Sequence, residues 1–310
     1  MCRWTRRTWF AGVLLFAGAC SGPRKSRQLE IAFVIKALDS EFWLRVKNGA
    51  EAAARTAPEV KLTVLAPERE INIDQQVTIL EDQIVKRVAA LAVAPAGVWE
   101  VIPVLDKAKA AGIPVLIADT DVPWASKRGF IGIDNRLGGK LAGAYVVNAI
   151  AGHGKVAVIG GIPGVATHEA RIAGFLEEIG KVPGIECVAV QPANSERATG
   201  MAVMENVLTL HRDLRAVFAT NDQMALGALE AIAAKRRTGQ IVLVGFDAGR
   251  ETLRAVQSGA LSAVIAQHPE RIGWETVRAA IQAAKRNPVA AWVDTGTAVV
   301  TRDNVARFLQ

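Results

Sequence analysis

The sequence predicts an α/β protein made of two similar lobes, each a doubly wound, mostly parallel sheet. Short apolar runs alternate with longer segments whose apolar residues recur at helical spacing, from about residue 29 to residue 300. Such alternation folds into parallel sheets, because each crossover helix returns the chain to the same end of the sheet. The plan occurs twice along 310 residues, a length that suits one large or two medium domains.

The first half contains five short apolar runs, each too short for a helix and followed by a turn or a helical pattern. In the first helical segment Phe42, Val46, Ala50 and Ala53 fall on one stripe, which indicates a helix packed on a sheet. We expect strands at residues 30–35, 60–65, 89–94, 113–117 and 130–133, and helices at residues 42–56, 74–87 and 98–111.

The second half begins at Asp134 and repeats this order. We expect strands at residues 155–159, 185–190, 216–219, 241–244 and 261–266, helices at residues 135–150, 168–180, 197–210, 224–232 and 271–285, and an extended segment at residues 294–301. The glycine-rich stretch 159–164 lacks both the G-x-G-x-x-G spacing and the lysine of a phosphate-binding loop, so it predicts a tight turn.

Two polar residues follow neighbouring strands in the segment from Arg215 to Gly249. Asn221 comes after the strand at residues 216–219 and is suited to cap the next helix, and Asp247 comes after the strand at residues 241–244. Parallel strands end at the same edge of a sheet, where open α/β sheets bind ligands. We therefore expect both side chains at a ligand site.

The motifs FATND with MALGALEA, and then VGFDAG, resemble the periplasmic sugar-binding proteins of the ribose-binding type, whose fold also forms the effector core of LacI-type repressors. The resemblance runs from about Leu29 to Val300. It implies the type I periplasmic binding protein-like fold, in which a hinge of three strands joins the lobes. The crossings are expected near residues 133/134, 267/268 and 294/295, which gives one lobe of residues 29–133 and 268–294 and another of residues 134–267 and 295–310.

A sugar pocket needs carboxylates and amides for the hydroxyl groups and flat aromatic walls for the C–H faces. The resemblance implies that two adjacent aromatic rings sandwich the sugar, and that polar side chains at strand ends in both lobes bind its hydroxyls. Ser40 stands where the ribose binders have an amide. The expected ligand-binding residues are Lys36, Ser40, Phe42, Trp43, Asp119, Arg171, Asn221, Asp247 and Gln267.

Four positions depart from the ribose-binding pattern. Lys36 stands where a small hydroxyl residue is usual, Thr120 replaces an arginine, Ala94 replaces an asparagine and Ser195 replaces a phenylalanine. These departures argue against ribose itself. Lys36 followed by Phe42-Trp43, and TGTAVVT near the carboxyl terminus, are similar to a subset of sugar-binding lipoproteins and binders of furanose-like signalling molecules.

Four of the expected ligand-binding residues also have a purely structural interpretation. Lys36 is expected to bond a ring hydroxyl or to pair with Asp119, or else to be a solvated lysine at a strand end. Arg171 is either a cleft residue or an arginine on a helix surface. The rings of Phe42 and Trp43 are either pocket walls or core of the first helix.

The amino terminus resembles an export signal. Three arginines precede an apolar run from Trp9 to Ala19, which is too short to span a bilayer. Ala17-Gly18-Ala19-Cys20 is similar to a lipobox, so residues 1–19 are expected to be removed and Cys20 to carry lipid, although ordinary cleavage after Ala19 also fits. Arg6-Arg7 leaves twin-arginine export open. Residues 20–28 are expected to be a polar tether.

Charge, cysteines and histidines exclude several classes of function. The formal charge of +7 falls to +4 without the three signal arginines and to +1 without Arg24, Lys25 and Arg27, so no basic face for nucleic acid is expected. Cys2 leaves with the signal, and Cys187 has no partner for a disulfide and is expected to be buried. The four histidines lack metal-ligand spacing, so we expect no metal and no cofactor.

Together these features predict a non-enzymatic solute-binding protein of an ABC importer, periplasmic or at the cell surface and held there by a lipid anchor. It is expected to be a monomer that binds a monosaccharide or sugar-like polyol between its lobes, closes about its hinge and delivers the ligand to an inner-membrane permease. A sensor component that presents the sugar to a chemoreceptor or histidine kinase is the first alternative. A repressor core, disfavoured by the signal and the absent helix-turn-helix, and an enzyme on this scaffold are the others.

Overall fold

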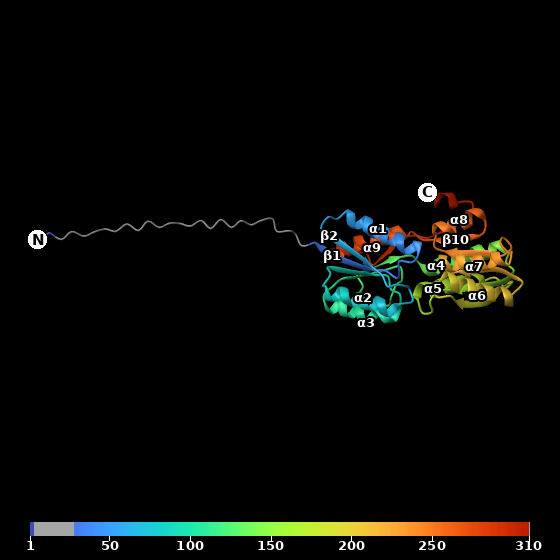
Figure 1. Cartoon of the computed structure of the whole chain (residues 1–310), viewed down its shortest axis with the longest axis horizontal. Helices are drawn as coiled ribbons and strands as arrows, with labels where there is room; N and C mark the ends of the chain where they lie inside the picture. The colour runs from blue at the N-terminus through green and yellow to red at the C-terminus, as the bar shows by residue number, and fades with distance from the viewer. Residues whose placement is uncertain (3–27, 310) are drawn as a thin grey trace.

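The protein is described here by a computed structural model that covers residues 1–2 and 28–309. The predicted signal segment from residue 3 onward, Cys20 and the predicted tether before residue 28 lie outside these residues. Figure 1 shows two lobes side by side, each with a central sheet between layers of helices. Within the described residues the strands form two six-stranded sheets, in the orders β11-β5-β4-β3-β1-β2 and β12-β10-β9-β8-β6-β7.

The first lobe surrounds the first of these sheets. Its strands are β1 (Leu29–Val34), β2 (Val60–Leu65), β3 (Ala90–Val93), β4 (Val115–Ala118), β5 (Gly129–Gly132) and β11 (Trp292–Asp294). Helices α1 (Glu41–Arg55) and α9 (Pro269–Ala284) pack on one face, and α2 (Ile73–Val85) and α3 (Val98–Ala110) pack on the other (Figure 1). Buried Phe33 and Val34 point to opposite faces and join these two cores.

The second lobe repeats this plan. Its strands are β6 (Gly154–Gly160), β7 (Ile185–Pro192), β8 (Leu214–Ala219), β9 (Val242–Phe246), β10 (Ala263–Ala266) and β12 (Ala298–Val300). One face carries α4 (Asn135–Ala149) and α5 (Ala166–Ile179), and the other carries α6 (Arg197–Leu210), α7 (Asp222–Ala234) and α8 (Arg250–Ser258). A 3₁₀ turn, η1 (Val305–Arg307), packs against α8 near the carboxyl terminus.

The predicted fold of two doubly wound lobes joined by three crossings is confirmed. The chain passes between the sheets after β5, after β10 and between β11 and β12. All strand pairs are parallel except β10 with β12. Strand β12 is free to run antiparallel because it enters directly from the other sheet, without a crossover helix. The residue numbers at which one lobe gives way to the other remain a prediction.

Three pairs of helices, α1 with α9, α4 with α5 and α6 with α7, approach through reciprocal glycines. A Cβ at Gly49 would lie 2.0 Å from the carbonyl oxygen of Glu270, and one at Gly273 would lie 1.9 Å from that of Val46. Gly139 and Gly174 do the same in the second lobe, and a Cβ at Gly227 or Gly200 would lie 2.1 Å from the carbonyl oxygen of Arg197 or 2.8 Å from the Cα of Met224. Each pair therefore packs backbone to backbone, and this fixes the helices that carry the site.

The structure differs from the sequence expectations at one helix and at one cysteine. Helix α8 was not predicted, although Leu253 and Val256 are buried and Gly259 ends the helix with φ of 81°. Within the described residues Cys187 is a free cysteine, and it is only half-buried, where full burial was expected. No helix among residues 28–309 is both long and apolar enough to cross a bilayer.

Replacing Gly273 by alanine should lower the free energy of unfolding by about 1–3 kcal/mol, because the added methyl group must force α1 and α9 apart. Urea unfolding measures the change. Arg278→Ala in the same helix is the control, since Arg278 is exposed and its ion pair with the half-buried Glu275 should contribute little. Equal stability of the two variants would contradict the backbone-to-backbone packing of these helices.

Candidate functional site

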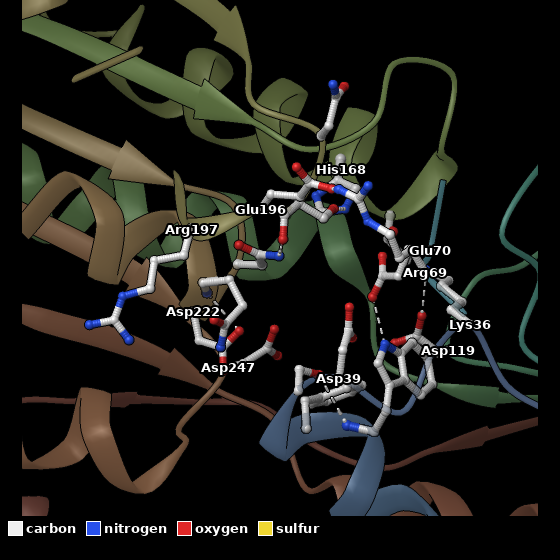
Figure 2. Close-up of a pocket in the computed structure, with 18 of the residues that line it drawn as sticks. Lys36, Asp39, Arg69, Glu70, Asp119, His168, Glu196, Arg197, Asp222 and Asp247 are labelled. Carbon is white, nitrogen blue, oxygen red and sulfur yellow. Dashed lines mark hydrogen bonds and ion pairs between the residues drawn. The ribbon is translucent and has the colours of Figure 1, made fainter. Parts of the chain in front are cut away.

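A cavity of about 230 Å³ lies between the two lobes at the carboxyl ends of both sheets. Figure 2 shows its side chains converging from opposite sides. This volume is below the range of about 300–1,000 Å³ typical for drug-sized ligands, so the cavity suits a smaller molecule. The structure brings all nine of the predicted site residues to its lining: Lys36, Ser40, Phe42, Trp43, Asp119, Arg171, Asn221, Asp247 and Gln267.

Asp119 and Asp247 occupy equivalent places in the two lobes. Each follows a sheet strand, β4 or β9, and each has a left-handed backbone, with φ of 60° and 70°. Each amide also donates to the next strand, to the carbonyl of Ile131 at 2.9 Å and to that of Ile265 at 2.8 Å. Aspartate tolerates this conformation better than most residues, so the same turn directs a carboxylate into the cavity from either lobe.

Lys36 is the cation paired with Asp119. Its Nζ lies 3.0 Å from Asp119 Oδ2, and both side chains are only 4% exposed. The Thr120 hydroxyl donates to the same oxygen at 3.0 Å. The prediction that Lys36 pairs with Asp119 is confirmed, and the alternative of a solvated lysine is wrong.

Arg171 and Gln267 hold Asp247. Gln267 Nε2 donates to Asp247 Oδ1 at 2.6 Å, and Arg171 Nη1 lies 4.0 Å from Oδ2. Arg171 also donates to the carbonyl of Thr220 at 2.7 Å, and its guanidinium lies 3.7 Å from the centre of the Phe246 ring. Stacking and hydrogen bonding keep this buried arginine in one orientation, so it is no surface residue.

Asn135 and Asn221 link helix ends to the site. Asn135, at the start of α4, accepts from Arg171 Nε at 2.9 Å, while Asp134 caps α4 by accepting from the amide of Leu137. Asn221 caps α7 through its Oδ1, which accepts from the amide of Met224 at 2.9 Å. Its Nδ2 donates to the carbonyl of Ser195, and one amide hydrogen remains for a ligand.

The two aromatic residues do not form the expected sandwich. The rings of Phe42 and Trp43 meet edge to face, with centres 5.0 Å apart and planes at 85°, so a sugar cannot lie between them. Both also pack in the core of the first lobe. The Trp43 indole donates to Glu70 at 2.6 Å, and Ser40 caps α1 by accepting from the amide of Trp43. Both rings still line the cavity, so each can contact one face of a ligand.

Other lining residues were missed or given no role by the sequence analysis. Residues from the loops after β1 and β2, from the start of α5, and from the segments that follow β7 and β8 complete the wall: Asp39, Arg69, Glu70, Ile71, Thr167, His168, Asn194, Ser195, Glu196, Arg197, Asp222 and Gln223. Asp222 is the last residue of the FATND motif and directly follows Asn221, so the sequence could have indicated it as a cavity residue. Nothing in the sequence places the loop residues Arg69 and Glu70 beside strands that lie far from them in the chain.

Burial shifts the acid–base equilibria of the cavity toward neutral forms. Desolvation raises the pKa of Asp222 to about 8, and the charge of Asp247 adds to it. Desolvation also raises the pKa of Asp247 to about 6, against the opposing charge of Arg171. The pKa of Glu70 rises for the same reason, and that of His168 falls well below its usual value. The site therefore holds several carboxyl groups whose neutral form burial favours.

Comparison with known proteins gives consistent matches over most of the chain. Residues 31–288 match the family described as "Periplasmic binding protein domain". The ribose import binding protein of Bacillus subtilis (strain 168) is 31% identical over 82% of this chain and 81% of its own. The D-ribose/D-allose-binding protein of Pseudomonas aeruginosa is 37% identical over 73% and 72%. A carbohydrate transporter solute-binding protein from Agrobacterium radiobacter, in complex with D-arabinose, superposes with a TM-score of 0.87 at 29% identity, over 91% of this chain and 97% of that one.

Replacing Lys36 by methionine should lower the free energy of unfolding by about 3–5 kcal/mol, because the Asp119 carboxylate would stay buried without its cation. Adding Asp119→Asn to this variant should restore most of the loss. Lys61→Met, which removes an exposed ion pair with Glu30, should cost about 0–1 kcal/mol. Chemical unfolding at neutral pH measures all three. A loss in Lys36→Met no larger than in the control would show that Lys36 does not compensate the buried charge of Asp119.

Asp222 and Asp247 should make the free energy of unfolding of the ligand-free protein fall as pH rises from about 4 to 8. Both folded-state pKa values lie above the ordinary 3.8, so the folded state binds more protons than the unfolded chain in this window, and its free energy of unfolding falls with pH. Asp222→Asn should flatten the slope by up to about 1.4 kcal/mol per pH unit. Urea midpoints from pH 5 to 8 measure it, with the exposed Asp213→Asn as control. Parallel profiles of wild type and Asp222→Asn would rule out a raised pKa at Asp222.

Proposed function

The chain belongs to the periplasmic sugar-binding proteins of the ribose-binding type, and we propose that it captures a monosaccharide or sugar-like polyol in the cavity between its lobes and delivers it to an ABC importer. As a member of this family it is a sugar-binding protein of the kind that serves ABC transporters. The observation that carries the proposal is the convergence of nine predicted side chains, from both lobes, on one small cavity.

The chemistry of the lining supports a polyhydroxylated ligand. Asp119 and Asp247 present acceptor oxygens from opposite lobes, and Asn221 keeps a donor free. A sugar hydroxyl both donates and accepts, so it pairs with carboxylates and amides together. Phe42 and Trp43 offer apolar surface for its C–H faces. Lys36 and Arg171, although engaged with aspartates, retain further N–H donors for ligand oxygens.

Contacts between the lobes support capture by hinge closure. Glu41 in the first lobe accepts from the amide of Arg250, at the start of α8 in the second lobe, at 2.7 Å. Arg45 donates to the carbonyl of Ala248 at 2.9 Å, and Arg69 pairs with Glu196 across the cavity mouth. A ligand drives closure only if it binds the closed state more tightly than the open one. A sugar held by both lobes meets that condition, and no covalent bond is made or broken.

The same proposal gives the location of the protein in the cell and its partners. The relatives belong to a periplasmic binding protein family, so we place this protein outside the inner membrane, where it would meet its permease. We propose that it acts as a monomer held by a lipid at Cys20. The departures at Ala94, Thr120 and Ser195 favour a monosaccharide other than ribose.

A thermal-shift screen over pentoses, hexoses, deoxy sugars and polyols tests the function, because a ligand that binds only the folded state raises its melting temperature. Calorimetry on the best ligand should then find binding weakened at least tenfold by Asp247→Ala, at about 1–3 kcal/mol for each unpaired hydroxyl. Asn221→Ala should weaken it similarly, and should also cost about 1 kcal/mol of stability as a lost helix cap.

Asp213→Ala is the matched control, since Asp213 pairs with Lys155 on the exposed surface and should leave affinity unchanged. If no sugar or polyol raises the melting temperature, the proposed function is wrong. If Asp247→Ala and Asn221→Ala both bind like the control, the second lobe does not contribute to the site.

The lipid anchor has its own test in the native host. Wild-type protein should fractionate with membranes and carry the mass of a lipidated amino-terminal cysteine, because Ala17-Gly18-Ala19-Cys20 is similar to a lipobox. Cys20→Ser should be released in soluble, unlipidated form, whereas Cys187→Ser should stay at the membrane. A soluble, unacylated wild-type protein would refute the anchor and leave the sugar site untouched.

A further inference from the structure

A hydrogen-bonded chain of three side chains ends at the cavity wall. The Thr220 hydroxyl oxygen lies 2.9 Å from His168 Nδ1, and the Ser195 hydroxyl oxygen lies 3.1 Å from His168 Nε2. Thr220 is fully buried, whereas Ser195 and His168 line the cavity. Ser195 is brought there by a left-handed backbone, with φ of 63°. The chain thus connects a buried hydroxyl to one that faces the ligand space.

The proton positions in this chain follow from counting donors. Among residues 28–309, His168 Nδ1 is the only side-chain partner of the Thr220 hydroxyl. If Nδ1 carried the ring proton it would donate to Thr220, and the hydroxyl hydrogen of Thr220 would be buried without an acceptor. An orphaned buried donor costs about 1–3 kcal/mol. If Nδ1 is bare, it accepts from Thr220 and every group is satisfied.

The surroundings keep the imidazole neutral and in place. The positive charges of Arg171 and Lys36 add to desolvation in lowering its pKa, so the doubly protonated ring is disfavoured at neutral pH. The ring packs on Gly161, where a Cβ would come within 2.3 Å of its atoms. The glycine-rich turn after β6 therefore provides the space that the imidazole occupies.

We infer that His168 carries its proton on Nε2 and donates it to Ser195, so that the Ser195 hydroxyl hydrogen is left to donate to a ligand oxygen. Ser195 is then a specificity-determining residue, and His168 and Thr220 are positioning residues that act through it. This deepens the proposed function: the ligand places a hydroxyl or ring oxygen at this wall, and a sugar that lacks that oxygen is discriminated against.

The proton position is tested first, in the ligand-free protein. Long-range ¹H–¹⁵N correlation spectra of histidine-labelled protein at pH 7 should show a ring with Nε2 protonated and Nδ1 bare, assigned to His168 by its loss in His168→Phe. The same pattern should persist when sugar is added. A proton on Nδ1, or on both nitrogens, would overturn the inference whatever the protein binds.

The donor is tested with the sugar selected by the thermal-shift screen and with its monodeoxy analogues. In the wild type, one deoxy analogue should bind about tenfold or more weakly than the parent sugar. Ser195→Ala should weaken the parent to the same extent and bind that analogue as the wild type does, so the ratio of the two affinities approaches one. His168→Phe, which keeps a ring but removes both nitrogens, should also reduce the ratio, and Ser258→Ala on the exposed end of α8 should preserve it.

The outcomes separate this inference from the function on which it rests. If sugars bind and Ser195→Ala leaves the ratio of parent to deoxy affinity unchanged, Ser195 is no donor and only the inference is wrong. If Ser195→Ala weakens every sugar equally, its effect is structural and the inference is again wrong. If no sugar binds the wild type, both the proposed function and the inference are overturned.

Discussion

The organisation of the site depends on keeping two carboxyl groups buried at the wall of the cavity between the lobes. Asp119 and Asp247 end equivalent strands in the two lobes, and a buried carboxylate is costly unless cations and hydrogen-bond donors surround it. Lys36 and Thr120 meet this need in the first lobe, and Gln267 and Arg171 in the second. Residues that look unrelated in the sequence therefore share one role, because the lysine at a strand end and the arginine on a helix both compensate a buried carboxylate.

The same requirement links binding to closure. Each lobe carries its own aspartate, so a ligand that satisfies both must hold the lobes together. Backbone-to-backbone helix pairs, fixed by glycines such as Gly49 and Gly273, make each lobe a tightly packed unit, so the closure we propose would bend the chain at the three crossings. Contacts at the rim, such as Glu41 with the amide of Arg250, add little area but set how the closed lobes meet.

The sequence predicted much of the fold and a large part of the cavity lining, because both follow from local patterns. Apolar runs locate strands, and parallel strands deliver residues such as Asn221 and Asp247 to one edge. The errors and omissions concern side chains whose orientation depends on tertiary packing. Adjacent Phe42 and Trp43 suggested a sandwich, but their perpendicular rings leave no slot. His168 was dismissed for lack of metal-ligand spacing, whereas its place at the wall depends on the space above Gly161. Glu70 comes from an irregular loop that no periodicity marks.

If the proposed function is right, carboxylates of both lobes hold one sugar. A crystal structure of the protein with the ligand selected by the thermal-shift screen would show this contact. A single sugar should lie in the cavity between the lobes, with hydroxyls within hydrogen-bond distance of both Asp119 and Asp247, about 2.5–3.0 Å for O–H···O contacts. A sugar bound outside this cavity, or one that contacts only a single lobe, would refute the shared role of the two aspartates.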